Sequence, residues 1–282
     1  MAAPKSPVHR SFGFLARLFG GLVSNPRWTL EATRMVTPAA RGMRFSRKSF
    51  PVLQNGRIGQ GLPARDIDRP QHQNNPLRSY FENHKEGPGI FKWIHYFDTY
   101  HRHFSKFVGR DVHVMEIGIW SGGSLHMWRE YFGNNSRIIG VDIDKACLAY
   151  KTEGIEVLIG DQGDRSFWKE VRSALPRVDI LIDDGSHHPE QQLVTLEEML
   201  PHIQPGGVYM TEDIHGATNY FASYVAGLSS VLNSGTPSPF VASIDSVHLY
   251  PFVIIIEKTS QDREYFKSEM RGSEWRPPVK GW

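Results

Sequence analysis

The chain has 282 residues, 40% of them hydrophobic, which fits one ordinary domain with an extension or two small domains. A formal net charge of +2 does not indicate a nucleic-acid partner, and the single cysteine, Cys147, excludes an intrachain disulfide. Because no apolar run reaches the about 18 residues that a membrane helix needs, we expect no membrane span.

The first part of the chain is basic and irregular. Four Lys and Arg residues precede the first acidic residue, Glu31, and no clear period follows. This composition is typical of an organelle transit peptide or of a basic tail. We interpret residues 1–75 as an extension and residues 76–282 as the functional domain. The expected location is the cytoplasm, with organellar import as the alternative.

A helical period follows the Gly-Pro-Gly turn at 87–89. Apolar and aromatic residues recur at three- and four-residue steps from Ile90 to Val108. Such spacing places them on one face of a helix. We therefore expect an amphipathic helix over this stretch.

From residue 112 onward, short apolar runs alternate with helical stretches. Strands are predicted at 112–118, 137–143, 155–161, 178–184 and 207–213, and helices at 123–132, 166–175, 189–200 and 217–233. Two last strands, 240–250 and 252–258, are separated only by Pro251, which is too short a link for a parallel crossover. The pattern predicts an α/β fold with a mostly parallel, Rossmann-like sheet, helices on both faces and a terminal antiparallel hairpin.

A glycine-rich turn joins the first predicted strand to its helix. Its notable residues are Glu116, Gly118, Gly122, Gly123 and Ser124. Glycines there permit a tight turn and close approach of a ligand, and Asp142, which ends the next strand, is placed to accept hydrogen bonds from ribose hydroxyls. Because position 120 is Trp, the spacing is not that of the dinucleotide fingerprint. The turn instead resembles motif I of class I S-adenosylmethionine-dependent methyltransferases, which implies S-adenosylmethionine as cofactor. An ordinary tight turn is the alternative.

Asp161 and Gln162 end the third predicted strand. In the fold that motif I implies, this edge borders the adenine, so a carboxylate there would accept a hydrogen bond from the adenine amino group. The alternative is that Asp161 caps the helix that follows.

Two neighbouring strands end in acidic and imidazole residues. The first carries Asp183, Asp184, His187 and His188, and the second carries Glu212, Asp213 and His215. Adjacent parallel strands lie about 4.8 Å apart, so these carboxylates would repel one another unless they are compensated. A divalent cation is the simplest compensation, and oxygen ligands favour Mg²⁺ or Mn²⁺ over zinc. The alternative is that the side chains alternate, cap helices or pair with Lys and Arg.

The motif Asp-Asp-Gly-Ser-His at 183–187, the Pro-Gly-Gly at 205–207 and the acidic pair at 212–213 resemble the metal-dependent sugar O-methyltransferases of macrolide biosynthesis, of the mycinamicin and macrocin type. The terminal hairpin and the segment around Trp93 are similar as well, so the resemblance covers residues 78–260.

The resemblance also implies roles for individual residues. Asp184, Glu212 and Asp213 would hold Mg²⁺, His187 would act as the base, and Asp183 would lie beside the cofactor. A second imidazole, His188, follows the motif directly. This departure leaves open which of the two imidazoles is the base.

The expected reaction is methyl transfer from S-adenosylmethionine to a hydroxyl of a sugar or sugar-containing small molecule. The metal would lower the pKa of the hydroxyl and a neutral His would take its proton. The predicted helices at 76–107 and 217–233 would cover the pocket.

Three other hypotheses of function remain from the sequence. They are a catechol or phenolic O-methyltransferase, a non-catalytic scaffold with the same fold, and an iron-dependent hydroxylase, which the oxygen-rich cluster disfavours. The oligomeric state is left open, with a homo-oligomer as one option.

Overall fold

The computed structural model describes residues 75–215, 219–235, 238–263 and 269–272. The predicted basic extension, residues 1–75, lies outside the described residues except for its last position. Within the described part, no helix is both long and apolar enough to cross a membrane.

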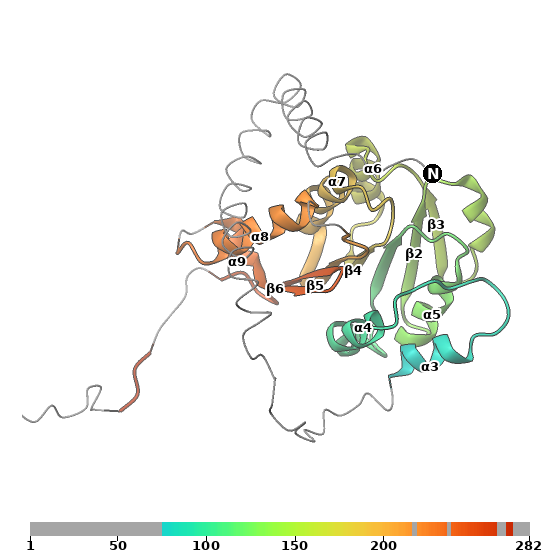
Figure 1. The fold of residues 1–282 in the computed structure, drawn as a ribbon, viewed down its shortest axis with the longest axis horizontal. Coiled ribbons are helices and arrows are strands. Elements are labelled where there is room, and N and C mark those ends of the chain that lie inside the picture. The colour runs from blue at the N-terminus through green and yellow to red at the C-terminus, as the bar shows by residue number, and fades with distance from the viewer. Residues whose placement is uncertain (1–74, 216–218, 236–237, 264–268, 273–282) are drawn as a thin grey trace, which may run out of the picture.

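A seven-stranded sheet forms the centre of the fold (Figure 1), in the order β3-β2-β1-β4-β5-β7-β6. The strands are β1 His113–Ile117, β2 Arg137–Asp142, β3 Ile155–Ile159, β4 Val178–Asp183, β5 Ile203–Thr211, β6 Ile244–Tyr250 and β7 Val253–Lys258. Strands β1 to β5 are parallel, and β7 is antiparallel to both β5 and β6. The predicted mostly parallel sheet with a terminal antiparallel hairpin is therefore confirmed.

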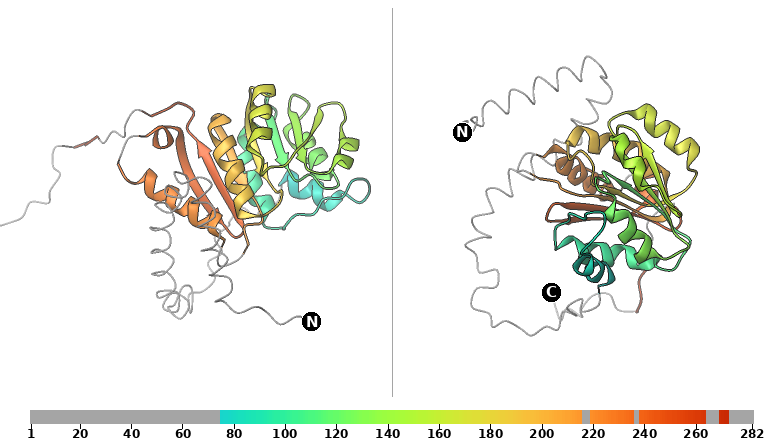
Figure 2. Two further views of the ribbon diagram at one scale, coloured as in Figure 1. Left: turned by 90° about the horizontal axis from the view of Figure 1, so that it is seen from above. Right: turned by 90° about the vertical axis from the view of Figure 1, so that its right-hand side faces the viewer.

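Helices cover both faces of this sheet (Figure 2). One layer consists of α3 Pro76–Asn83, α4 Tyr96–Phe104 and α5 Gly123–Phe132, and the other of α6 Arg165–Ala174, α7 Pro189–Met199 and α8 Tyr220–Leu232. A short helix, α9 Pro239–Ser243, and the 3-10 turns η1 Ser105–Phe107, η2 Lys145–Tyr150 and η3 Leu200–His202 complete the described elements. The two layers enclose separate apolar cores, since successive strand residues point to opposite faces.

Three predicted elements were wrong in extent. The strand expected at 207–213 runs from Ile203 to Thr211. The helix expected from Ile90 begins at Tyr96, because the chain from residue 84 to 95 is not helical. The segment 76–107 is thus two helices, α3 and α4, with a loop between them. Only Phe91 of this loop lines the strand-end cavity, so the expected cover by this segment and by the helix at 217–233 stays a prediction. The strand expected from residue 240 begins at Ile244, because Ser238 caps α9 by accepting a hydrogen bond from the Val241 N–H.

The strand order places a switch point between β1 and β4. From β1 the chain moves outward to β2 and β3, then returns to β4 and continues to β5 on the other side. In open α/β sheets, ligands bind at the carboxyl ends of the strands beside such a point. The glycine-rich turn after β1, Asp142, Asp161 and the two acidic motifs all lie at these strand ends, whereas the Pro-Gly-Gly at 205–207 lies in the first half of β5.

Candidate active site

A buried lysine lies at the centre of the acidic strand ends. The Lys92 ammonium nitrogen is 2.7 Å from Asp184 Oδ2, 3.1 Å from Glu212 Oε2 and 3.2 Å from Glu116 Oε1. Its side chain is only 3% exposed. Burial alone would lower the pKa of Lys92, but the carboxylates of Asp184 and Glu212 raise it well above its ordinary value. Lys92 is therefore a fixed cation, and it supplies much of the charge compensation that the sequence analysis assigned to a metal.

Two tyrosines of α4 contact the acidic pair that follows β5. The Tyr100 hydroxyl donates to Glu212 Oε1 at 2.8 Å, and the Tyr96 hydroxyl donates to Asp213 Oδ1 at 2.6 Å. Glu212 is fully buried, and this burial raises its pKa although the neighbouring Lys92 ammonium opposes the shift. Both carboxylate oxygens of Glu212 thus have protein partners, so its expected role as a metal ligand stays a prediction.

We call the strand ends that carry Asp184, Glu212 and Asp213 the acidic edge. On its outer side an imidazole lies beside the carboxylates. Ligand atoms of Asp184, His187 and Asp213 lie within 4.8 Å of one another. His187 Nε2 is 3.8 Å from Asp213 Oδ2. The two carboxylates are suitable ligands for a hard divalent cation, with water in the remaining positions. Asp184 and Asp213 therefore fit a bound Mg²⁺ on this side of the cluster, and the His187 imidazole lies beside them.

His187 and Asp213 have unusual backbone conformations. Their φ angles are 54° and 53°, in the left-handed region that residues other than glycine seldom adopt. Such conformations cost about 1–3 kcal/mol each and often occur at functional sites. His188, in contrast, is the exposed N-cap residue of α7 and does not line the pocket described below.

The glycine-rich turn packs directly against the acidic loop. Gly118 has a φ of +79°, and a Cβ there would lie 2.2 Å from the Asp184 carbonyl oxygen. Asp142 Oδ2 accepts hydrogen bonds from the backbone N–H groups of Ile119 and Trp120, at 3.0 and 3.1 Å. Asp142 therefore holds the turn in shape as well as facing the cavity.

A cavity of about 460 Å³ joins the glycine-rich turn to the acidic edge. Of the predicted cofactor and metal residues, its lining includes Gly118, Asp142, Asp161, Gln162, Asp184, His187 and Asp213. Asp161 does not cap α6, because Asp164 does so by accepting from the Ser166 N–H. The structure thus brings both predicted halves of the site to one cavity.

The other predicted cofactor residues lie behind this lining. Glu116 is fully buried and accepts a hydrogen bond of 2.5 Å from the Ser124 hydroxyl. Gly122 and Gly123 provide space for the Tyr150 ring and for the carbonyl groups at 88–89. These residues therefore support the glycine-rich turn and do not line the cavity themselves.

Asp183 is buried beneath the cavity. Its Oδ1 accepts a 2.9 Å hydrogen bond from the Gln162 side chain, while its Oδ2 has no hydrogen-bond partner among the described residues. Burial raises the pKa of Asp183 to about 7 although Gln162 opposes the shift. Gln162 also accepts from the Ser186 N–H at 2.7 Å, so it links the third and fourth strand ends.

Sequence reasoning missed Lys92 and the roles of Tyr96 and Tyr100. Lys92 interrupts the apolar stretch from Ile90 to Ile94, and a charge in such a run is a signal of a buried partner. That signal could have identified it.

The fold and the strand-end cavity are similar to those of Rossmann-like methyltransferases. Residues 115–214 match the family model described as a methyltransferase domain.

The chain is also similar to sugar O-methyltransferases. It is 38% identical to demethylmacrocin O-methyltransferase of Streptomyces fradiae over 133 residues, which is 44% of this chain and 33% of that enzyme. It is 31% identical to 8-demethyl-8-alpha-L-rhamnosyl tetracenomycin-C 2'-O-methyltransferase of Streptomyces olivaceus over 202 residues, 60% of this chain and 52% of the relative. The chain therefore spans a third to about half of the length of these relatives.

A similar solved structure is MycE methyltransferase from the mycinamycin biosynthetic pathway, in complex with Mg and SAH. It has a TM-score of 0.57 and 27% identity, and the match covers 68% of this chain and 55% of that one. The resemblance inferred from the Asp-Asp-Gly-Ser-His motif is thus confirmed.

Proposed function

We propose that this chain is an S-adenosylmethionine-dependent O-methyltransferase that uses Mg²⁺ or Mn²⁺ and methylates a hydroxyl of a sugar or sugar-containing small molecule. One observation carries the proposal: Asp184, Asp213 and His187 converge on a cavity that Gly118 and Asp142 also line. Its support from relatives is that MycE has been solved with Mg, SAH and mycinamycin VI.

The residues at the ends of β1, β2 and β3 are placed to bind S-adenosylmethionine. The Gly118 turn leaves room for close approach of a ligand. Asp142 accepts hydrogen bonds from three backbone N–H groups, and its Oδ1 retains one lone pair for a ribose hydroxyl. Asp161 and Gln162 line the wall at the third strand, where the adenine is expected. S-adenosylmethionine, when bound, supplies an electrophilic methyl group, and the protein then chiefly has to position the acceptor.

The residues around Asp184 and Asp213 would bind the acceptor hydroxyl and remove its proton. A divalent cation held by Asp184 and Asp213 would lower the pKa of an acceptor hydroxyl. His187 lies beside Asp213, and its imidazole is 40% exposed, so it is accessible to receive the hydroxyl proton. Tyr96 fixes the Asp213 carboxylate, and Lys92 fixes that of Asp184.

A phenolic or catechol acceptor is the second candidate. Phe91 and Trp120 line the same cavity and are 79% and 70% exposed. Flat aromatic side chains at a cavity suit a planar acceptor ring. Sugar and phenolic acceptors are therefore to be compared in the same assay.

The test is release of S-adenosylhomocysteine from S-adenosylmethionine with Mg²⁺ and a panel of glycosides and catechols. We expect turnover of a glycoside, with His187→Ala lowering the rate by about 10²–10⁴-fold and sparing cofactor affinity. Asp184→Asn should lower Mg²⁺ affinity and nearly abolish turnover. His188→Ala is the matched control and should have a mild effect.

Other results would overturn parts of the proposal. A dead His188→Ala enzyme would move the base to His188. Activity that survives a chelator would reject the metal, and turnover of catechols alone would reject the sugar.

The remaining expectations are proposals with simple tests. Residues 76–282 are proposed to fold without residues 1–75, which a truncated chain with unchanged cofactor binding would support. Sedimentation would determine whether the chain forms a homo-oligomer, and a fluorescent fusion of residues 1–50 would distinguish cytoplasmic retention from organellar import.

A further inference from the structure

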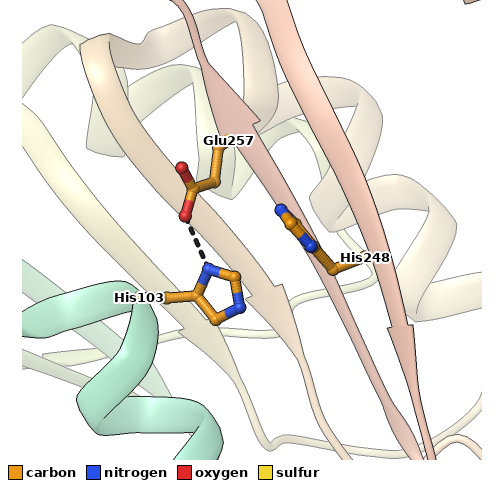
Figure 3. A group of neighbouring side chains, drawn as sticks. All are labelled: His103, His248 and Glu257. Atoms are coloured by element: carbon orange, nitrogen blue, oxygen red, sulfur yellow. Dashed lines mark hydrogen bonds and ion pairs between the residues drawn. The ribbon is translucent and has the colours of Figure 1, made fainter.

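A second group of possible metal ligands lies away from the cavity. His103 on α4, His248 on β6 and Glu257 on β7 converge between the helix and the hairpin (Figure 3). Ligand atoms of the three residues lie within 4.8 Å of one another. Because His103 follows Tyr96 by seven residues on α4, the group is about 10 Å along the helix from the acidic edge.

The register of the hairpin brings the strand residues to one face. Glu257 is paired with Ser246, and His248 is paired with Ile255. Residues two apart on a strand point to the same side, so His248 and Glu257 both face α4. Three separate elements therefore supply one ligand each, which local sequence spacing could not have indicated.

Each of the three side chains has a defined position. His103 is 4% exposed, and its Nδ1 is 2.5 Å from Glu257 Oε1 while its Nε2 is 2.9 Å from the Tyr250 hydroxyl. The His248 ring centroid is 4.6 Å from that of His103. His248 Nε2 contacts Ser246 Oγ at 2.9 Å, and its Nδ1 has no hydrogen bond to the described residues.

The charge states of these side chains suit metal binding. Burial lowers the pKa of His248, so its imidazole is neutral near pH 7 and keeps a lone pair. The hydrogen bond from His103 lowers the pKa of Glu257 to about 2, so its carboxylate is ionised. Metal ligands must be deprotonated in this way.

We propose that His103, His248 and Glu257 form a second metal site, selective for a zinc-like divalent ion and distinct from the Mg²⁺ site at the acidic edge. Two imidazoles and one carboxylate are a ligand set typical of zinc, whereas Mg²⁺ prefers oxygen atoms. A water molecule would complete four-coordination.

Small side-chain movements are sufficient to form this site. Bonds of about 2.0–2.2 Å to a tetrahedral ion place its ligand atoms about 3.3 Å apart. The His103–Glu257 contact would open by less than an ångström, and the separations of up to 4.8 Å would close. Lys106 contacts the other carboxylate oxygen, Glu257 Oε2, and is 44% exposed, so solvent screens its charge.

The zinc site would connect the β6–β7 hairpin to the acidic edge through α4. Zinc would fix the C-terminal end of α4 on β6 and β7, while Tyr96 and Tyr100 on the same helix hold Asp213 and Glu212. Its role would therefore be structural, through the position of α4, and the proposal does not depend on the methyl-transfer function.

The test measures Zn²⁺ binding by the full chain in saturating Mg²⁺, which occupies the acidic edge. We expect one Zn²⁺ per chain, a rise in melting temperature on binding, and an anomalous scattering peak between the three side chains in Zn²⁺-soaked crystals. His248→Ala should weaken this binding by at least about 10–100-fold, the loss found even for outer partners of metal ligands.

Two further variants keep the result interpretable. His126→Ala removes a histidine on α5 that lines a different hollow, with Arg129 and Glu130, and should bind Zn²⁺ as the wild type does. Glu257→Gln keeps the side-chain volume and should also lose Zn²⁺, which covers the case that His248→Ala fails to fold. Equal Zn²⁺ affinity in wild type, His248→Ala and Glu257→Gln, or an anomalous peak elsewhere, would overturn the proposal.

Discussion

Lys92 is the residue on which the electrostatics of the acidic edge depend. Three carboxylates lie within 3.2 Å of its ammonium nitrogen, and two of them, Glu116 and Glu212, are fully buried. Removing one partner of a buried charge cluster leaves the others uncompensated, whereas forming the cluster adds little net stability. Lys92 is thus needed to compensate the buried carboxylates, although the cluster as a whole adds little to the stability of the fold.

We predict that Lys92→Met lowers the free energy of unfolding by about 3–5 kcal/mol, measured by urea denaturation, because buried carboxylates lose their cation. Added Mg²⁺ should recover part of this loss. Lys106→Met is the control, since Lys106 is ion-paired but 44% exposed, and it should cost about 1 kcal/mol or less. Equal stability of Lys92→Met and wild type would show that the carboxylates are protonated or hydrated.

The sequence predicted much of the site at this scale. Gly118, Asp142, Asp184 and His187 line one cavity because each follows a parallel strand, and strand ends meet at one edge. Lys92 was missed because its partners lie 24, 92 and 120 positions away in the chain. Such long-range pairing leaves no period in the sequence.

At the scale of elements, helices with local signals were predicted well. Helix α5 begins at Gly123, after a left-handed Gly122, and α7 begins with Pro189, close to expectation. The start of α4 was wrong, because its N-cap residue, His95, makes no side-chain capping bond and the apolar spacing continues outside the helix. Periodicity alone therefore cannot locate a helix end that tertiary contacts determine.

The turn between β1 and α5 provides a test of close packing at a strand end. Gly118→Ala would place a Cβ 2.2 Å from the Asp184 backbone oxygen, so the acidic loop would have to move. We expect a large fall in melting temperature and loss of S-adenosylhomocysteine binding by calorimetry.

Gly109→Ala is the matched control for this substitution. Gly109 has a similar φ of +74°, but no atom of the described residues, its chain neighbours aside, lies within 4 Å of its Cβ position. It should show only the left-handed strain of about 1–2 kcal/mol, with binding intact. If both variants behaved alike, backbone strain rather than the contact with Asp184 would explain the effect.

At the scale of the whole molecule, α4 joins two distant parts of the fold. Its first turns hold the carboxylates that follow β5, and its last turn packs on the β6–β7 hairpin through the His103–Glu257 pair. The edge of the sheet that was predicted only as a terminal hairpin therefore supports the site. Sequence patterns identified the hairpin and the helix separately, but not their contact, because 154 positions separate His103 from Glu257.

The stability of this contact should depend on pH. The hydrogen bond from His103 lowers the pKa of Glu257 from 4.5 to about 2, so the folded state binds fewer protons than the unfolded state between these values. The stabilisation is present above pH 4.5 and is lost as the pH falls toward about 2. Glu257→Gln removes this pH-dependent stabilisation, since an amide does not titrate.

Urea denaturation with a chelator present should therefore show Glu257→Gln to be less stable than wild type at neutral pH. The difference should shrink at about pH 3, where the wild-type carboxylate begins to lose its advantage. Glu86→Gln, at an exposed glutamate with no ion pair among the described residues, should match wild type at both pH values. A stability difference between Glu257→Gln and wild type that is constant with pH would mean that packing, and not the charge of Glu257, joins α4 to the hairpin.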